Sequence, residues 1–190
     1  MDGVNAKRAF SLAGCCWVCR VGLLAVVAAV SLPPPTWAQT DGSPGENLLS
    51  LRIADGELRA AVLDGSERSK TLRNLLTRVG ELKAIVYVQW TAALPRGVEA
   101  AIEQHVTVTP NVRYLRIGVK PARATDGVVS IIAHELRHAI EILEAEVTDS
   151  SAIEALFKRL SGGLTVRVYE TTAAVETGLV VSRELRNSRR

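Results

Sequence analysis

Two histidines and a glutamate in the stretch HELRH at 134–138 have the residue types and the spacing of a metal site. In an α-helix, residues four apart lie on the same face, about one turn above each other. His134 and His138 would therefore present two imidazoles to one point, as a zinc ion requires. Glu135 lies roughly 100° away around the helix, where its carboxylate can reach a water at that point. The pattern predicts two zinc ligands and a general base.

A catalytic zinc site usually takes three protein ligands, and three glutamates compete for the third place. Glu170 lies 32 residues after His138, at the expected start of the last helix, where small residues such as Ala173 permit a close approach. Glu144 would need a chain reversal after His138, whereas residues 139–143 continue the helix. Glu141 is a full turn beyond His138, too far along the axis. We predict Glu170 as the third ligand and keep Glu144 as the alternative.

Ordinary structural roles compete with these assignments. Two histidines in a helix can be hydrogen-bonded core or surface residues, with Glu135 in a helical ion pair. Glu170 can be an acidic residue in the first turn of a helix, where the helix dipole favours it.

The pattern resembles the gluzincin branch of the zincin metallopeptidases, in a small single-domain form covering about 82–186. It is also similar to uncharacterised bacterial exported proteins with an IVYV-like strand, an HELxH helix and a later ET-x-AA helix, here at 85–88, 134–138 and 170–174. The resemblance implies a zinc metallopeptidase that hydrolyses peptide or protein substrates. Gluzincins often carry an Asp four residues after the ligand Glu. Ala174 stands there in this chain, so the support of the ligand histidines must differ.

The resemblance also implies how a substrate binds. Zincins lay the substrate strand along an exposed sheet edge beside the zinc, and the expected strand Val112–Val119 would be that edge. They also supply a Tyr, His or Arg that stabilises the oxyanion. Possible donors, none of them preferred, are Tyr87, Tyr114, Tyr169 and Arg116, while His105 is predicted to be a loop or core histidine.

Two other function classes remain open from the sequence. The first is a non-catalytic exported zinc-binding domain, in which the metal fixes the helices and a cleft binds a peptide or a cell-envelope component. The small size of the domain and the missing Asp motivate this alternative. The second is a membrane protein anchored by its leader, with no metal.

Hydrophobic patterns predict the elements that position these residues. Leu49, Leu51 and Ile53 alternate before Asp55-Gly56, and alternation resumes after it, which predicts a β-hairpin. The next expected elements are a helix at Glu67–Val79 capped by Ser66, a strand at Leu82–Trp90 that is well buried at 85–88, and a short helix at Gly97–Gln104. A strand at Val112–Val119 and a buried central helix from Asp126 to about Glu146 follow. The last expected elements are a helix opened by a Ser151/Glu154 capping box, an extended segment at Leu164–Tyr169, and a helix from Glu170 or Thr171 to Arg186.

These elements mix without regular βαβ alternation, which indicates an α+β fold. The expected architecture is zincin-like: a small mixed or antiparallel sheet packed on the central HELRH helix, followed by C-terminal helices.

The first residues read as a targeting segment. Basic residues precede the apolar run Val21–Leu32, and a small-x-small site ends at Ala38, as in a secretory signal peptide. The run is well below the ~20 residues that span a bilayer, so membrane attachment is expected only if the leader stays uncleaved. The predicted organisation is a signal peptide at 1–38, a flexible arm at 39–47, a zincin-like metal-binding domain at 48–187 and a tail at 188–190. The protein is expected to be exported to the periplasm or the exterior.

Removing the leader leaves no cysteine, since Cys15, Cys16 and Cys19 all lie within it. The mature domain then has no disulfide and no thiolate ligand, and any metal must take nitrogen and oxygen donors. Lys+Arg falls from 23 to 20 and Asp+Glu from 20 to 19, a net charge of +1. No basic stripe with interleaved aromatic residues appears, so a nucleic-acid partner is not expected.

Overall fold

The computed structural model describes residues 49–161 and 170–189, all within the unit Thr40–Arg190. The described residues form an α+β fold with a mixed sheet, as the sequence predicts. In chain order the elements are β1 (Leu51–Ile53), α1 (Gly56–Arg68), α2 (Lys70–Glu81), β2 (Ala84–Trp90), β3 (Ala100–Ile102), β4 (Thr107–Val108), β5 (Arg113–Val119), α3 (Asp126–Glu144), α4 (Ser150–Leu160) and α5 (Thr172–Asn187).

The sheet has the order β1-β2-β5-β3, with β4 also paired to β5. β1, β2 and β5 run parallel, whereas β3 and β4 run antiparallel to β5. Ala100 pairs with Val119 and Ile102 with Ile117. The expectation that 112–119 is a free edge was therefore wrong, because β5 has neighbours on both sides. The edge beside α3 is β3.

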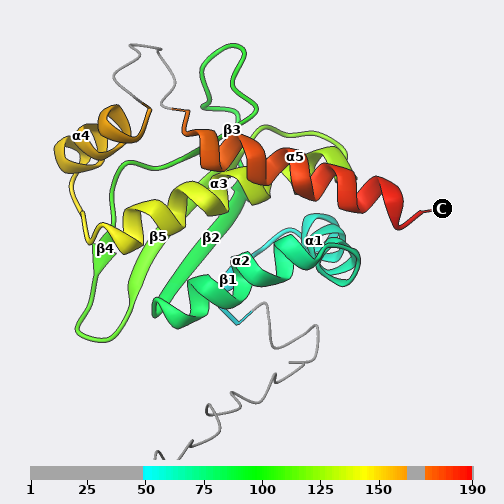
Figure 1. The fold of residues 1–190 in the computed structure, drawn as a ribbon, viewed down its shortest axis with the longest axis horizontal. Coiled ribbons are helices and arrows are strands. Elements are labelled where there is room, and N and C mark those ends of the chain that lie inside the picture. Colours follow the sequence, from blue (N-terminus) through cyan, green and yellow to red (C-terminus); the bar gives the residue numbers. More distant parts are fainter. Residues whose placement is uncertain (1–48, 162–169, 190) are drawn as a thin grey trace, which may run out of the picture. The chain divides into compact units, whose positions relative to one another are not determined.

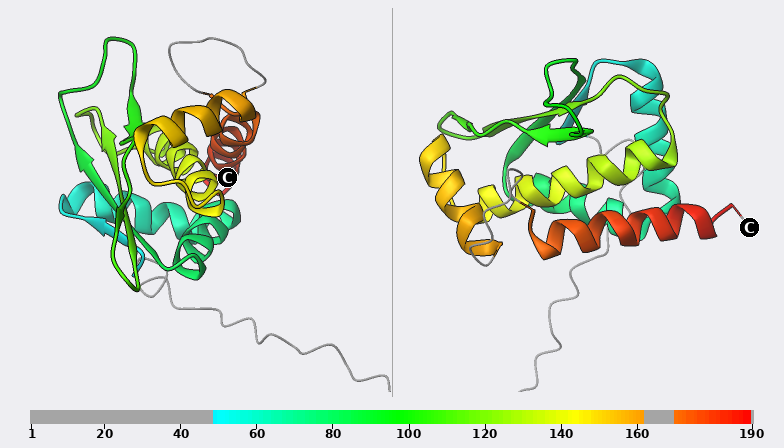
Figure 2. Two further views of the ribbon diagram at one scale, coloured as in Figure 1. Left: turned by 90° about the vertical axis from the view of Figure 1, so that its left-hand side faces the viewer. Right: turned by 90° about the horizontal axis from the view of Figure 1, so that it is seen from above.

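α2, α3 and α5 lie on one face of the sheet, and α3 lies between the sheet and α5 (Figures 1 and 2). α3 and α5 pack side by side and run in opposite directions. Val86 and Val88 of β2 face the helices and are buried, whereas Tyr87 is 40% exposed. The predicted burial of 85–88 thus holds only for alternate residues, because the helices cover a single face.

The central helix and the amphipathic helix before β2 agree with the sequence pattern. α3 is buried on most sides, including Val129, Ile132, Leu136 and Ile140. α2 buries the predicted stripe Leu72, Leu75, Leu76 and Val79. However, the N-cap of α2 is Ser69, whose side chain accepts a hydrogen bond from the amide of Leu72. Ser66 lies inside α1 instead.

The predicted hairpin around Asp55-Gly56 was wrong. The Asp55 carboxylate accepts a hydrogen bond from the amide of Leu58 at 2.8 Å, so Asp55 caps α1 rather than shaping a turn. Leu58 and Val62 are buried four residues apart, while Ala60 between them is exposed. The apparent alternation was one face of a helix read with a period of two.

Several boundaries also differ from the prediction. The expected short helix at 97–104 is strand β3, because pairing with β5 outweighs a weak helical propensity. Thr125, not Asp126, is the N-cap of α3. Asp149, not Ser151, caps α4, since its carboxylate accepts from the amide of Ala152.

Some expectations fall outside the described residues: the signal peptide, the arm at 39–47 and the extended segment Leu164–Tyr169. Within the described ranges, no helix is both long and apolar enough to cross a membrane.

Candidate metal centre

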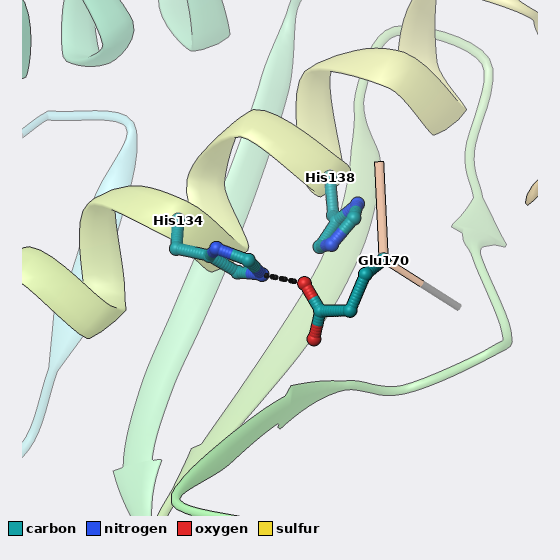
Figure 3. A group of neighbouring side chains, drawn as sticks. All are labelled: His134, His138 and Glu170. Atoms are coloured by element: carbon teal, nitrogen blue, oxygen red, sulfur yellow. Dashed lines mark ion pairs between the residues drawn. The ribbon is translucent and has the colours of Figure 1, made fainter. Parts of the chain in front are cut away.

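Three side chains from two parts of the chain meet beside α3. His134 and His138 lie one turn apart on α3, and Glu170 comes just before α5. Their ligand atoms all lie within 4.8 Å of one another. Figure 3 shows Glu170 pointing toward the two rings, with its Oε2 3.0 Å from His134 Nε2. The two rings are 4.8 Å apart between centroids and nearly perpendicular.

The donor set fits a metal ion. Tetrahedral coordination with bonds of about 2.0–2.2 Å places neighbouring ligand atoms roughly 3.3–3.6 Å apart. The observed separations range from 3.0 Å, between His134 and Glu170, to at most 4.8 Å, so side-chain rotation alone can complete the convergence. Two imidazoles and one carboxylate suit a borderline divalent cation. The described residues therefore contain a group that can hold a metal ion.

The charges of the three side chains are complementary without any metal. Burial lowers the pKa of His134, but the hydrogen bond to Glu170 and the charges of Glu135 and Glu170 outweigh burial and raise it overall. The same hydrogen bond lowers the pKa of Glu170. A cation at this place would replace the proton that His134 and Glu170 share in their hydrogen bond.

Glu135 is a buried carboxylate beside the cluster, 6% exposed. Burial raises its pKa, and the nearby charges of His138 and His134 offset only part of that effect. The backbone of Ile102 in edge strand β3 acts in the opposite direction and lowers the pKa slightly. A carboxylate with a raised pKa next to a cation site has the properties of a group that accepts and returns a proton.

A second buried glutamate supports His138. Glu141 Oε2 lies 3.0 Å from His138 Nδ1, and Glu141 Oε1 accepts a hydrogen bond from the hydroxyl of Thr171 at 2.9 Å. Burial opposes ionisation of Glu141, but the hydrogen bonds from His138 and Thr171 lower its pKa overall. The sequence-based prediction considered Glu141 only as an unsuitable ligand and did not foresee this supporting contact. The spacing of three residues between His138 and Glu141 on one helix is the pattern that could have indicated it.

The alternative ligand Glu144 lies elsewhere. Its Oε1 is 2.9 Å from a guanidinium nitrogen of Arg78 on α2, and it is not part of the group that converges beside α3. Glu144 is one residue short of the α3 C-cap, so it continues along the helix as the pattern of 139–143 indicates.

The close approach of α5 to α3 depends on a glycine that the sequence pattern did not single out. A Cβ atom at Gly178 would lie 3.3 Å from the Cβ of His134 and 3.4 Å from the carbonyl oxygen of Ser130. The predicted small residues at the start of α5 are present, and Ala174 is fully buried. Gly178, one turn further on, lies against His134, the first ligand.

Two cavities flank the cluster and share Glu135 and Glu170 in their walls. The larger, about 680 Å³, includes His134, and the smaller, about 240 Å³, includes His138. Edge-strand residue Ala100 lines both. One cavity lies on the His134 side of the cluster and the other on the His138 side, both beside β3, and the two together are called the groove below.

Three of the residues considered as oxyanion donors lie away from this groove. Tyr87, Tyr114 and Arg116 line a different hollow, together with His105. Tyr169 falls outside the described residues. Among the described residues lining the two cavities at the cluster, no Tyr or Arg is present.

Comparison with family models, with curated proteins and with solved structures gave no match to this chain. The class that the fold and the site define is an α+β domain with a two-histidine, one-glutamate group able to hold a metal ion.

Proposed function

We propose that this chain is an exported zinc metallopeptidase of the zincin type, with His134, His138 and Glu170 as the zinc ligands and Glu135 as the general base. The observation that carries the proposal is the convergence of these ligand atoms within 4.8 Å. A buried carboxylate of raised pKa lies beside them. The leader predicted from the sequence motivates the proposed periplasmic or extracellular location.

When bound, zinc would lower the pKa of a water and polarise a substrate carbonyl. Glu135 would take the proton of the attacking water and pass it to the leaving amine. Burial raises the pKa of Glu135 above the ordinary value of a glutamate, which makes its carboxylate a stronger proton acceptor.

The groove supports a peptide as the substrate. β3 is a sheet edge, so an extended peptide can add to it by main-chain hydrogen bonds. Space on both sides of the cluster suits a chain that continues past the scissile bond in each direction. Val98, Ile131, Val175 and Leu179 line the larger cavity, which favours a bulky apolar substrate side chain there.

Replacing Glu135 by Gln tests catalysis separately from metal binding. Because Gln keeps the size but cannot accept the proton, we expect cleavage of a quenched peptide library to fall by about 10²–10⁴-fold. Zinc content should stay near that of the wild type. Equal cleavage by wild type and variant would contradict the proposed role.

A second candidate is a non-catalytic zinc-binding domain, favoured by the lack of a Tyr or Arg among the described cavity residues. In that case zinc would raise the melting temperature of the protein, while no peptide in the library would be cleaved by the wild type. Binding of uncleaved peptide to both wild type and Glu135→Gln would then identify the groove as a recognition site.

A further inference from the structure

We propose that Glu141 and Thr171 are positioning residues of the metal site. The buried carboxylate of Glu141 orients His138 and, through Thr171, fixes the chain beside Glu170. The inference rests on the metal-binding part of the proposed function and does not depend on catalysis.

The first half of this arrangement concerns the tautomer of His138. Glu141 Oε2 lies 3.0 Å from His138 Nδ1, and both side chains are about 95% buried. A carboxylate at this distance holds the imidazole proton on Nδ1. The unprotonated Nε2 is then the nitrogen offered to a metal. The phenyl ring of Phe157, 5.0 Å away and nearly perpendicular to the imidazole, restricts the ring further.

The second half concerns the third ligand. Glu170 precedes α5, so no helical backbone hydrogen bond of its own fixes its position. Thr171, the next residue, is buried and uses its hydroxyl twice: Oγ1 donates to Glu141 Oε1 at 2.9 Å and accepts from the amide of Ala174 at 3.1 Å. The threonine thereby caps α5 and ties the backbone next to Glu170 to α3.

One carboxylate thus connects two ligands that are 32 residues apart. Arg137 Nε lies 3.4 Å from Glu141 Oε1 and adds an ion pair without hydrogen-bond geometry. Glu141 itself is a poor ligand, because its Oε2 pairs with His138 Nδ1 and its Oε1 accepts from Thr171. The support of His138 thus comes from within α3 itself.

The test measures metal affinity rather than cleavage. Purified wild type, Glu141→Gln, Thr171→Val and Thr171→Ser are freed of metal and titrated with Zn²⁺ against a chromophoric chelator. We expect Glu141→Gln and Thr171→Val to lose about 10–100-fold in affinity. Thr171→Ser keeps the hydroxyl and should stay close to the wild type.

Glu144→Gln is the matched control, because it neutralises a glutamate on the same helix that pairs with Arg78 instead. Its affinity should equal that of the wild type. The visible spectrum of the Co²⁺-loaded proteins reports ligand geometry. It should change in Glu141→Gln and Thr171→Val and stay unchanged in Thr171→Ser and Glu144→Gln.

Wild-type affinity and an unchanged Co²⁺ spectrum in a folded Glu141→Gln would overturn the inference. If that variant does not fold, equal affinities of Thr171→Val and Thr171→Ser would overturn it instead. The expected affinity pattern in a protein that cleaves no peptide would sustain the positioning roles and contradict the proposed peptidase activity.

Discussion

His138, Glu141 and Thr171 show how the chain satisfies buried polar groups around the candidate site. Each has a hydrogen-bond partner within the group, as buried polar side chains require. His134 and Glu170 also pair directly through the atoms that would bind a metal. These five side chains therefore have polar partners without a metal, and three of them, His134, His138 and Glu170, can also hold a metal ion.

Asp126 gives a prediction on pH at the residue scale. Hydrogen bonds from Arg68 lower its pKa, against the opposing effect of burial. A carboxyl whose pKa is lower in the folded than in the unfolded protein stabilises the fold above the unfolded value of about 3.9, and this contribution is lost as the pH falls through the folded value. Asp126→Asn should be less stable than wild type at neutral pH and lose less stability on acidification.

Urea denaturation at about pH 7, 4 and 2.5 measures the effect, because the contribution is lost below the unfolded value. Asp64→Asn is the control, because Asp64 pairs with the same Arg68 but is 60% exposed and exposed pairs contribute little. An identical loss of stability with acid in wild type and Asp126→Asn would contradict the assignment.

Sequence reasoning at this scale succeeded where spacing alone fixes geometry. His134 and His138 share a helix face whatever surrounds them, and small residues at the start of α5 indicated that Glu170 could approach. The contact between Glu141 and Thr171 could not be predicted with the same force, because it depends on where the start of α5 lies relative to α3. The oxyanion candidates Tyr87, Tyr114 and Arg116 lie at another hollow for a similar reason: the side of the sheet that a strand residue faces depends on the register.

At the scale of elements, glycines mark where helices approach closely. A Cβ atom at Gly65 of α1 would lie 2.7 Å from Val129 Cγ1 on α3. Val129 is β-branched and has little rotamer freedom in a helix. Gly65→Ala should therefore lower the free energy of unfolding by about 1–3 kcal/mol through overpacking.

The same substitution at Gly80 of α2 should have the opposite sign. A Cβ there would meet Ser50 Oγ at 3.9 Å, an ordinary contact. The better helix propensity of Ala then raises stability by up to about 1 kcal/mol. Chemical denaturation of both variants checks the pair, and a stabilised Gly65→Ala would show that α1 and α3 separate easily.

The element predictions succeeded for long periodic segments and failed for short ones. α2, α3 and β5 are long enough for the spacing of their apolar residues to distinguish a helix from a strand. Residues 58–62 fit a period of two or of four, and the cap at Asp55 decided between them. β3 has three residues and owes its conformation to pairing with β5. Because β5 comes later in the chain, this pairing cannot be predicted from the residues of β3 alone.

At the scale of the whole molecule, the sheet edge, α3 and α5 surround one groove. Leu179 of α5 is 59% exposed and lines its larger cavity. Leu179→Gln should lower kcat/KM by about tenfold for peptides with a bulky apolar residue in that cavity, with zinc affinity unchanged. Leu160→Gln is the control, since Leu160 is exposed at the end of α4 and lines another hollow. Equal effects of both variants would place the substrate side chain elsewhere.

Zinc titration of the metal-freed protein tests the central claim most directly, because the whole account depends on His134, His138 and Glu170 sharing one ion. We predict about one equivalent of zinc bound tightly by the wild type. His134→Ala and Glu170→Ala should each lose that binding, while Glu144→Ala retains it. Wild-type protein without saturable zinc binding, or full binding in Glu170→Ala, would contradict the proposed ligand set.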